Sequence, residues 1–175
     1  MGDLPGAGPQ DGPPQDPVSL RLIDAQATQA LGRQLARWLL AAQRPGEAAL
    51  LLLQGDLGAG KTCLVQGLAE ALGIDEPITS PTFALAHHYA GQRQGQATAL
   101  VHLDLYRLEQ AFSADELFAE EEEQARSLTA LLAIEWPQRL SALPAEAWRV
   151  ELELVDPQRP EAGRLATIRL PEGRR

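Results

Sequence analysis

A buried strand, a glycine-rich turn and a helix follow one another between residues 48 and 72 of the sequence. The apolar run at residues 48–53 has the length of a strand and no alternation, which is typical of strands covered on both faces in a parallel sheet. It leads into GDLGAGKT, residues 55–62, and then into a helical stretch that Gly73 closes. The motif satisfies G-x-x-x-x-G-K-[ST] in the setting that phosphate binding requires.

Each residue type in this motif has a chemical reason. Its glycines allow backbone conformations in which successive N–H groups converge on phosphate oxygens, and the free N–H groups of the helix, including that of Cys63, add to them. Lys61 supplies a compact ammonium to the β- and γ-phosphates, and Thr62 offers a hydroxyl to Mg²⁺. Lys61 is the only lysine in a chain with fourteen arginines, which fits a position that a planar guanidinium suits less well.

Strands and helices alternate along the rest of the chain. We expect a strand at residues 18–23, a helix capped by Asp24 that ends before Pro45, and a hairpin turning at GQRQGQ, residues 91–96. A capping box at residues 113–116 predicts the next helix, followed by an apolar strand at 128–134 and a closing hairpin of residues 148–155 and 164–170. The fold predicted is an α/β, P-loop NTPase-like sandwich, with a largely parallel central sheet and antiparallel edge hairpins.

The composition indicates one domain, residues 18–171, between two tails. Residues 1–17 hold five prolines and four glycines and are expected to be disordered, and residues 172–175 form a short C-terminal tail. The net charge of −9 argues against an unaided grip on nucleic acid. With one cysteine and no apolar stretch near the about 18 residues of a membrane span, we expect a cytoplasmic protein without membrane contact.

Two carboxylates are candidates for a metal site. Asp104 ends the apolar strand that also carries His102 on the same face, and Glu135 ends the strand ALLAI. In α/β sheets, ligands gather at the carboxyl ends of strands. Both acids can bind Mg²⁺, directly or through water, or one can orient the attacking water. A chain without Asn and without a second Lys lacks the Asn-Lys-x-Asp element that reads guanine, so ATP is favoured.

Four segments together resemble one protein family. GDLGAGKT, ITSPTF, HLDLYRL and IEWPQRL occur in the order seen in TsaE (YjeE), the small bacterial ATPase of tRNA threonylcarbamoyladenosine (t6A) biosynthesis. The resemblance runs from about Leu20 to the C-terminal strands. It implies Mg²⁺-dependent ATP hydrolysis that is slow in the lone protein and coupled to the TsaD and TsaB proteins. These transfer threonylcarbamoyl to adenosine 37 of tRNAs reading ANN codons, so tRNA is contacted only through the complex.

The resemblance also implies roles for single residues. Thr62 and Glu135 would ligate Mg²⁺, Asp104 would hold the metal through water or act in hydrolysis, and Thr82 would sense the γ-phosphate. The catalytic set is then Lys61, Thr82, Asp104 and Glu135. Nucleotide contacts are expected from Gly58, Ala59, Gly60, Lys61, Thr62 and Cys63, with Thr28 and Gly163 beside the adenine. Cys63 stands where the family usually has threonine.

Other interpretations stay open at this point. A small P-loop metabolite kinase would need an acceptor pocket and an arginine-bearing lid, and the segment between Asp104 and Glu135 is instead strongly acidic. A nucleotide-gated adaptor would bind ATP without hydrolysing it. The acidic run at residues 120–123 is expected on a solvated helix face. Cys63 is expected to be a small buried residue, with a lowered thiol pKa as the alternative. Arg107 is the nearest candidate for a transition-state arginine, although a structural role is favoured.

Overall fold

The computed structural model describes residues 12–14, 17–81 and 83–172. Within them the chain forms seven strands, three α-helices and two short 3₁₀ helices. In chain order these are β1 Val18–Leu22, α1 Ala25–Ala42, β2 Ala49–Gln54, α2 Lys61–Ala71, β3 Ala86–Arg93, β4 Gln96–Asp104, α3 Ala111–Ser127, β5 Leu131–Glu135, η1 Pro137–Arg139, β6 Trp148–Leu154, η2 Pro160–Ala162 and β7 Arg164–Arg169. Most of the predicted N-terminal tail lies outside the described residues.

All seven strands join in one sheet, in the order β1-β7-β6-β2-β5-β4-β3. The four central strands are parallel, with β2 paired to both β5 and β6 and β5 paired to β4. The β3–β4 and β6–β7 hairpins are antiparallel, and β1 adds to β7 as an antiparallel edge strand. The predicted fold class is confirmed. The domain boundaries expected at residues 18 and 171 stay a prediction.

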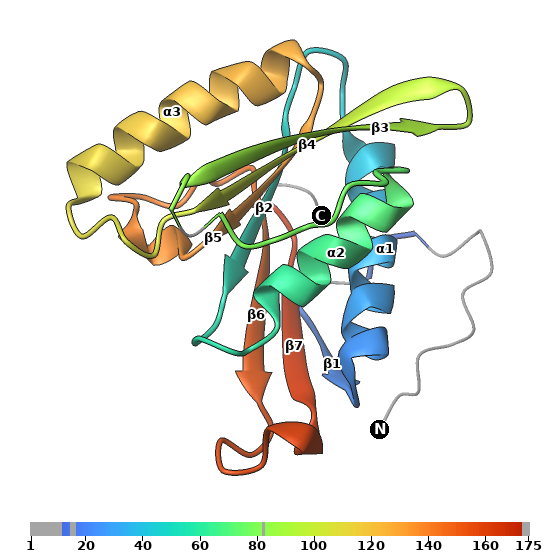
Figure 1. Ribbon diagram of the computed structural model, residues 1–175, viewed down its shortest axis with the longest axis vertical. Coiled ribbons are helices and arrows are strands. Elements are labelled where there is room, and N and C mark those ends of the chain that lie inside the picture. Colours follow the sequence, from blue (N-terminus) through green and yellow to red (C-terminus); the bar gives the residue numbers. More distant parts are fainter. Residues whose placement is uncertain (1–11, 15–16, 82, 173–175) are drawn as a thin grey trace.

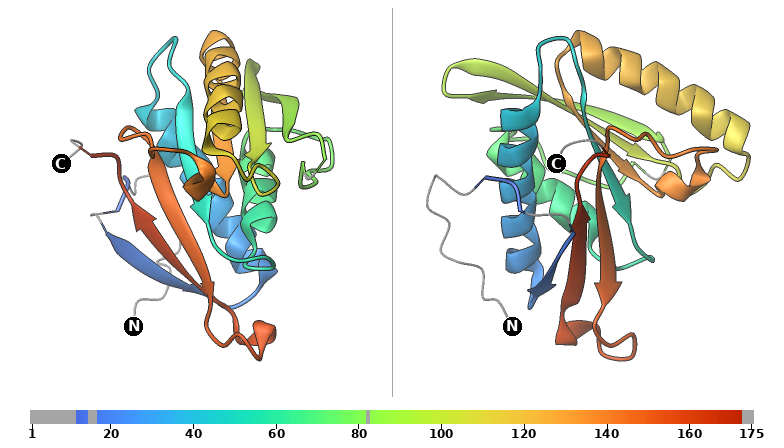
Figure 2. Two further views of the ribbon diagram at one scale, coloured as in Figure 1. Left: turned by 90° about the vertical axis from the view of Figure 1, so that its left-hand side faces the viewer. Right: turned by 180° about the vertical axis from the view of Figure 1, so that it is seen from behind.

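Two separate clusters of apolar side chains cover the two faces of the sheet. Because strand side chains alternate, Leu51 and Leu53 of β2 face one cluster, while Leu50 and Leu52 face the other. Helices α1 and α2 pack side by side on the first face, and α3 packs on the second against β4 and β5 (Figures 1 and 2). The continuous apolar run in β2 is thus explained by burial on both sides. No helix within the described ranges is long and apolar enough to span a membrane.

The ends of the first two helices follow the local sequence signals. Asp24 caps α1 through its carboxylate, which accepts the N–H of Ala27 at 2.8 Å. Gly73 follows α2 with φ of +69°, and the N–H groups of Gly73 and Ile74 donate to carbonyls of the last turn. Both predictions are confirmed, because each depends on contacts within a few residues.

Three predicted boundaries were wrong. Helix α3 begins at Ala111, so Ser113 of the expected capping box lies inside its first turn, and the N-terminal residue Gln110 makes no side-chain cap. Leu128 ends that helix and is exposed, whereas β5 begins only at Leu131. The β3–β4 turn is confined to Gln94 and Gly95, because Gly91 lies in β3, where a Cβ would collide with the carbonyl of Leu72 and the side chain of Ile74.

The acidic run at residues 120–123 is also not uniformly solvated. Glu121 is buried, and its carboxylate lies 2.5 Å from Nε2 of His88 on β3. Glu122 pairs with Arg126 one turn later, and Glu120 and Glu123 are exposed. The expectation of a solvated face therefore holds for Glu120 and Glu123 and is wrong for Glu121, which joins α3 to the edge of the sheet.

Replacing Gly67 with alanine is expected to destabilise the protein by about 2 kcal/mol, although alanine favours an isolated helix. Gly67 of α2 and Gly32 of α1 face the opposite helix, and a Cβ at Gly67 would collide with the carbonyl of Gln29. Urea unfolding measures the change. Gly12→Ala is the control, because a Cβ there meets nothing within 4 Å. Equal stabilities for both variants would contradict the close helix contact.

Candidate functional site

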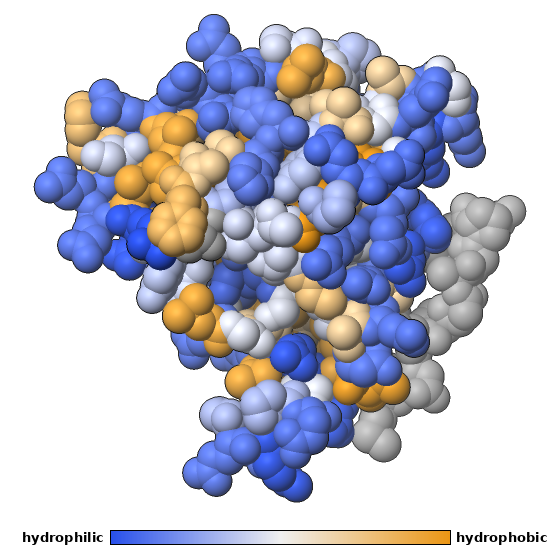
Figure 3. Space-filling view, in the orientation of Figure 1, coloured by the Kyte–Doolittle hydropathy of each residue, from blue (hydrophilic) through white to orange (hydrophobic). Residues whose placement is uncertain are grey.

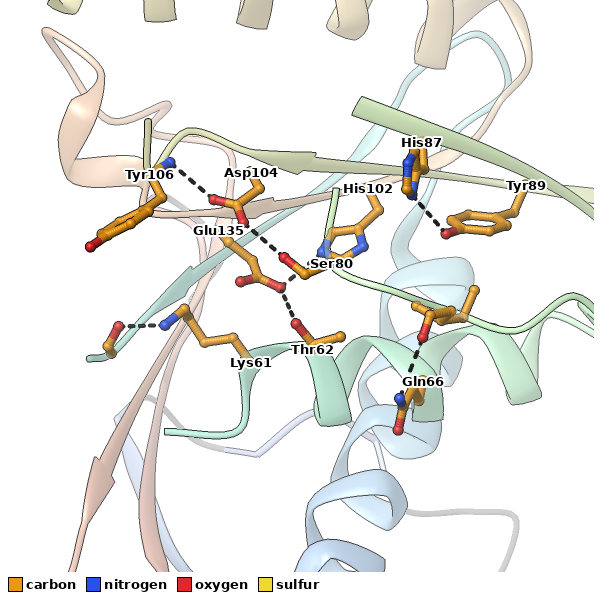
Figure 4. Close-up of polar contacts among 12 residues, drawn as sticks. Lys61, Thr62, Gln66, Ser80, His87, Tyr89, His102, Asp104, Tyr106 and Glu135 are labelled. Carbon is orange, nitrogen blue, oxygen red and sulfur yellow. Dashed lines mark hydrogen bonds and ion pairs between the residues drawn. The ribbon is translucent and has the colours of Figure 1, made fainter. Parts of the chain in front are cut away.

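The carboxyl ends of three parallel strands bring the predicted site residues together. Asp104 ends β4 and Glu135 ends β5, and the two are directly paired in register. Strand β2 continues into the glycine loop, residues 55–60, which leads to Lys61 and Thr62 at the start of α2. The side chains of both acids point toward the start of α2 (Figure 4). A cleft of about 390 Å³ lies between the two acids and the start of α2. Its lining residues are Leu57, Gly58, Gly60, Lys61, Thr62, Cys63, Ser80, Asp104, Tyr106, Glu135 and Trp136.

Lys61 is almost fully buried at the base of the cleft. Its Nζ donates to the carbonyls of Gly55 at 2.5 Å and Asp56 at 3.0 Å, and lies 4.6 Å from the ring centroid of Trp136. Burial holds the pKa of the Lys61 ammonium below its usual range, while the carboxylates of Glu135 and Asp104 act in the opposite direction. The groups that accept from the ammonium are uncharged carbonyls, which an anionic phosphate oxygen can replace.

Glu135 joins the start of α2 to the centre of the sheet. Its Oε1 accepts from Oγ1 of Thr62 at 3.0 Å and lies 2.9 Å from Nε2 of His102. Among the described residues, Nδ1 of His102 has no hydrogen-bond partner although the ring is fully buried. His102 thus lies against Glu135 beneath the cleft.

Asp104 anchors two loops at the end of β4. Its Oδ2 accepts from Oγ of Ser80 at 3.0 Å, and its Oδ1 accepts from the backbone N–H of Tyr106 at 2.9 Å. The first contact holds the segment before Pro81, and the second fixes the turn that follows the strand. Asp104 therefore lies next to the paired Thr62 and Glu135 without bonding to either.

The oxygens of Thr62 and Glu135 suit a magnesium ion. Adjacent ligands of octahedral Mg²⁺, each about 2.1 Å from the metal, stand about 3.0 Å apart. The observed separation of 3.0 Å is close to this value. In the described chain, no group of three or more His, Cys, Asp or Glu side chains is arranged to hold a metal ion. The residues that fit the ion are thus one hydroxyl and one carboxylate, and Asp104 lines the same cleft.

The glycine loop has the backbone shape that the motif predicts. Gly58 and Gly60 have φ of +80° and +103°, values that favour glycine. Ala59 is buried, and its N–H donates to the carbonyl of Asp56 at 3.0 Å. Sequence reasoning missed Arg164, whose guanidinium donates to carbonyls of this loop from β7. No local pattern marks such a contact, because its partners are main-chain atoms about a hundred residues away.

Two predicted residues, Thr28 and Gly163, lie apart from the cleft, and a third, Thr82, is not among the described residues. Thr28 is buried in α1, where its hydroxyl donates to the carbonyl of Asp24, and its methyl lies near Gly60. Gly163, with φ of +96°, packs against the backbone of Leu22. Neither lines the cleft, and adenine contact by either stays a prediction. Thr82 is not among the described residues, so its proposed role is untested.

Aromatic side chains border the cleft. Trp136 adopts a left-handed conformation with φ of +58°, which is strained for a bulky residue, and its ring lies 4.8 Å from that of Tyr106. Arg107 stacks over the ring of Phe83 at 4.5 Å and does not line the cleft. Leu57, Phe83 and Tyr106 are exposed, and we call them the apolar rim. Figure 3 shows apolar side chains grouped below α3 among polar ones.

Cys63 is half-buried, with its thiol near the carbonyl of Ala25 at 3.5 Å. Burial raises the pKa of this thiol above its ordinary 9.0, although Arg164 acts in the opposite direction. The alternative of a lowered thiol pKa is therefore wrong.

Iodoacetamide is expected to alkylate Cys63 several-fold more slowly than a free thiol at neutral pH, because the thiolate is the nucleophile. A raised pKa keeps the thiol protonated there, so the rate should climb only as the pH passes above 9. Intact-mass spectrometry follows the reaction, with a cysteine-containing peptide as the control. Fast alkylation at pH 7 would contradict this environment.

Comparison with known proteins decides the family. The profile described as "Threonylcarbamoyl adenosine biosynthesis protein TsaE" matches residues 22–162 of the chain. The chain belongs to the TsaE family. This agrees with the four segments that resembled TsaE in the sequence.

Individual TsaE relatives are similar over most of the chain. The "tRNA threonylcarbamoyladenosine biosynthesis protein TsaE" of Synechocystis sp. is 44% identical over 126 residues, covering 71% of this chain and 73% of that protein. The protein of the same name from Nostoc sp. is 42% identical over 138 residues, covering 77% of each. The crystal structure of YdiB from Bacillus subtilis superposes with a TM-score of 0.64 at 23% identity, covering 91% of this chain and 88% of that one. At this identity the likeness concerns the fold alone.

Proposed function

We propose that this member of the TsaE family binds and hydrolyses ATP in the biosynthesis of threonylcarbamoyladenosine at position 37 of tRNAs reading ANN codons. The observation that carries the proposal is the cleft in which Lys61, Thr62 and Glu135 meet at the end of the parallel strands. A phosphate loop beside a buried carboxylate is the arrangement that phosphoryl transfer uses. The TsaE relatives, which are named as threonylcarbamoyladenosine biosynthesis proteins, supply the biological setting.

In this proposal each residue has a defined task. Lys61 leaves the carbonyls of Gly55 and Asp56 to bind the β- and γ-phosphates, and the N–H groups of the glycine loop and of Cys63 donate to phosphate oxygens. Thr62 and Glu135 hold Mg²⁺, which neutralises charge on the phosphates when bound. His102 keeps Glu135 in place from below.

The loop anchored by Asp104 completes the site. Asp104 holds Ser80, and Thr82 two residues later is proposed to contact the γ-phosphate. Asp104 itself lies where it can orient water toward the metal or the phosphate. A state with ATP and a state with ADP would then differ in this loop, which is how a nucleotide controls the surface of a switch protein.

The proposed partners are the TsaD and TsaB proteins, through which tRNA is reached indirectly. Two features support a protein partner. The net charge of −9 disfavours direct binding of a polynucleotide. Leu57, which lines the cleft, is 66% exposed, and Phe83, another member of the apolar rim, is 87% exposed. Exposed apolar groups of this kind often mark protein contacts. Binding there would couple the nucleotide to the complex.

Phosphate release from ATP, with and without purified TsaD and TsaB, tests this function. We expect slow Mg²⁺-dependent release by the lone protein and faster release with both partners, because no arginine lines the cleft of the described chain to supply transition-state charge. A pull-down with ATP, ADP or no nucleotide tests the partnership separately. Phosphoryl transfer to a metabolite would instead indicate a kinase. Tight ATP binding without any release would indicate an adaptor.

A further inference from the structure

Arg164, the first residue of β7, reaches the glycine loop from the far end of the sequence. Its Nε donates to the carbonyl of Ala59 at 3.0 Å and its Nη2 to the carbonyl of Gly58 at 3.1 Å. The third nitrogen, Nη1, donates to the carbonyl of Pro160 at 3.2 Å within its own hairpin. One planar fork therefore joins two consecutive peptide groups of the loop to the end of the β6–β7 hairpin.

These two carbonyls control where neighbouring N–H groups point. In a trans peptide the C=O of one residue and the N–H of the next point in opposite directions. Fixing the carbonyls of Gly58 and Ala59 toward Arg164 turns the N–H groups of Ala59 and Gly60 away from it. The N–H of Ala59 bonds to Asp56, while Gly60 lines the cleft immediately before Lys61.

The end of the glycine loop needs a restraint from another part of the chain, because its own residues restrict the backbone conformation little. Gly58 and Gly60 flank Ala59, and both glycines have positive φ. Glycine has the widest conformational freedom of any residue. The start of the loop is held separately, since Gly55 packs so closely on β6 that a Cβ would lie 2.5 Å from the carbonyl of Leu152. Arg164 provides the corresponding contact at the end of the loop.

We propose that Arg164 is a positioning residue, which orients the peptide group between Ala59 and Gly60 so that the N–H of Gly60 faces the phosphates of the bound nucleotide. The proposal rests on the proposed function, because the ligand concerned is ATP or ADP. Arg164 acts through the loop backbone and sets the affinity for the phosphate part of the nucleotide. The fork matters more than the charge, since one guanidinium satisfies two adjacent carbonyls.

Three variants test this role by fluorescence titration with labelled ADP and ATP. Arg164→Gln removes charge and fork, Arg164→Lys keeps the charge without the fork, and Arg159→Gln is the matched control. Arg159 lies on the same hairpin, is exposed and pairs with Asp156. We expect both Arg164 variants to bind ADP and ATP about tenfold more weakly, because the loss of one charge-assisted hydrogen bond has an effect of this size. The Arg159 control should bind both nucleotides with the affinity of the wild-type protein.

Amide NMR spectra of the nucleotide-free proteins provide a readout independent of binding. The signals of Ala59 and Gly60 should shift in both Arg164 variants and stay in place in the Arg159 variant. Unchanged signals, or full affinity in Arg164→Lys, would overturn the proposal. If Arg164→Gln proves unstable on heating, the lysine variant decides. If the wild-type protein bound no ATP, the proposed function would fail, while the amide signals would still report the contact.

Discussion

Replacing Lys61 with methionine is expected to lower ATP turnover by at least about 100-fold, the usual effect of removing a donor that faces developing charge. The thermal midpoint of the nucleotide-free protein should be unchanged or higher. Lys61 is only 5% exposed, and burial already depresses the pKa of its ammonium, so an apolar side chain of similar length removes a desolvation cost. Phosphate release and thermal unfolding measured on the same preparation separate the two effects.

Lys61→Arg is the informative companion variant. It keeps the positive charge, but a guanidinium does not fit where the ammonium lies between the Gly55 carbonyl and the Trp136 ring. We expect its turnover to be as low as that of Lys61→Met. Wild-type turnover in Lys61→Arg would contradict the explanation for the single lysine in a chain that otherwise uses arginine.

Replacing Glu135 with glutamine is the second change with a large expected effect. Glutamine keeps the shape of the side chain and an acceptor for Thr62, but it loses the charge that holds Mg²⁺. Turnover should fall by about 100-fold or more. ATP binding in EDTA should be unchanged or tighter, because a buried carboxylate repels the triphosphate. Titration with labelled ATP, once in EDTA and once in Mg²⁺, measures the affinity for ATP without and with the metal.

The matched control for this experiment is Glu121→Gln. Glu121 is also buried and also faces a histidine, yet it lies between α3 and β3, away from the cleft. We expect this variant to hydrolyse ATP at the wild-type rate. If both variants lost turnover equally, the effect of Glu135 would be attributed to the loss of a buried carboxylate in general and not to the metal.

The sequence predicted which side chains lie together in the cleft where the signal was local or set by strand direction. The motif fixed the glycine loop and Lys61, because its chemistry depends on eight consecutive residues. Asp104 and Glu135 were found because apolar strands end at them and parallel strands end at the same edge. Their direct pairing in register supports that argument. The contact of His102 with Glu135 was left open, since alternation gives the face of a side chain but not its partner.

Long-range contacts account for most of what was missed. Glu121 reads as one of four exposed glutamates until β3 brings His88 against it. The capping box before α3 was wrong because the helix already begins at Ala111, two residues before Ser113, and Ala114 is buried against the sheet. Arg164 looks like an ordinary charged residue at the start of an alternating strand, and only the tertiary structure places its guanidinium on the glycine loop.

The most direct test of the central claim is phosphate release from ATP by the wild-type protein with TsaD and TsaB, with Mg²⁺ or with EDTA. We expect repeated turnover with Mg²⁺ that stops in EDTA and in Glu135→Gln. We also expect that GTP does not replace ATP, because the chain lacks the Asn-Lys-x-Asp element. Turnover that persists in EDTA or in Glu135→Gln, or a wild-type protein that releases no phosphate with its partners, would contradict the proposed function.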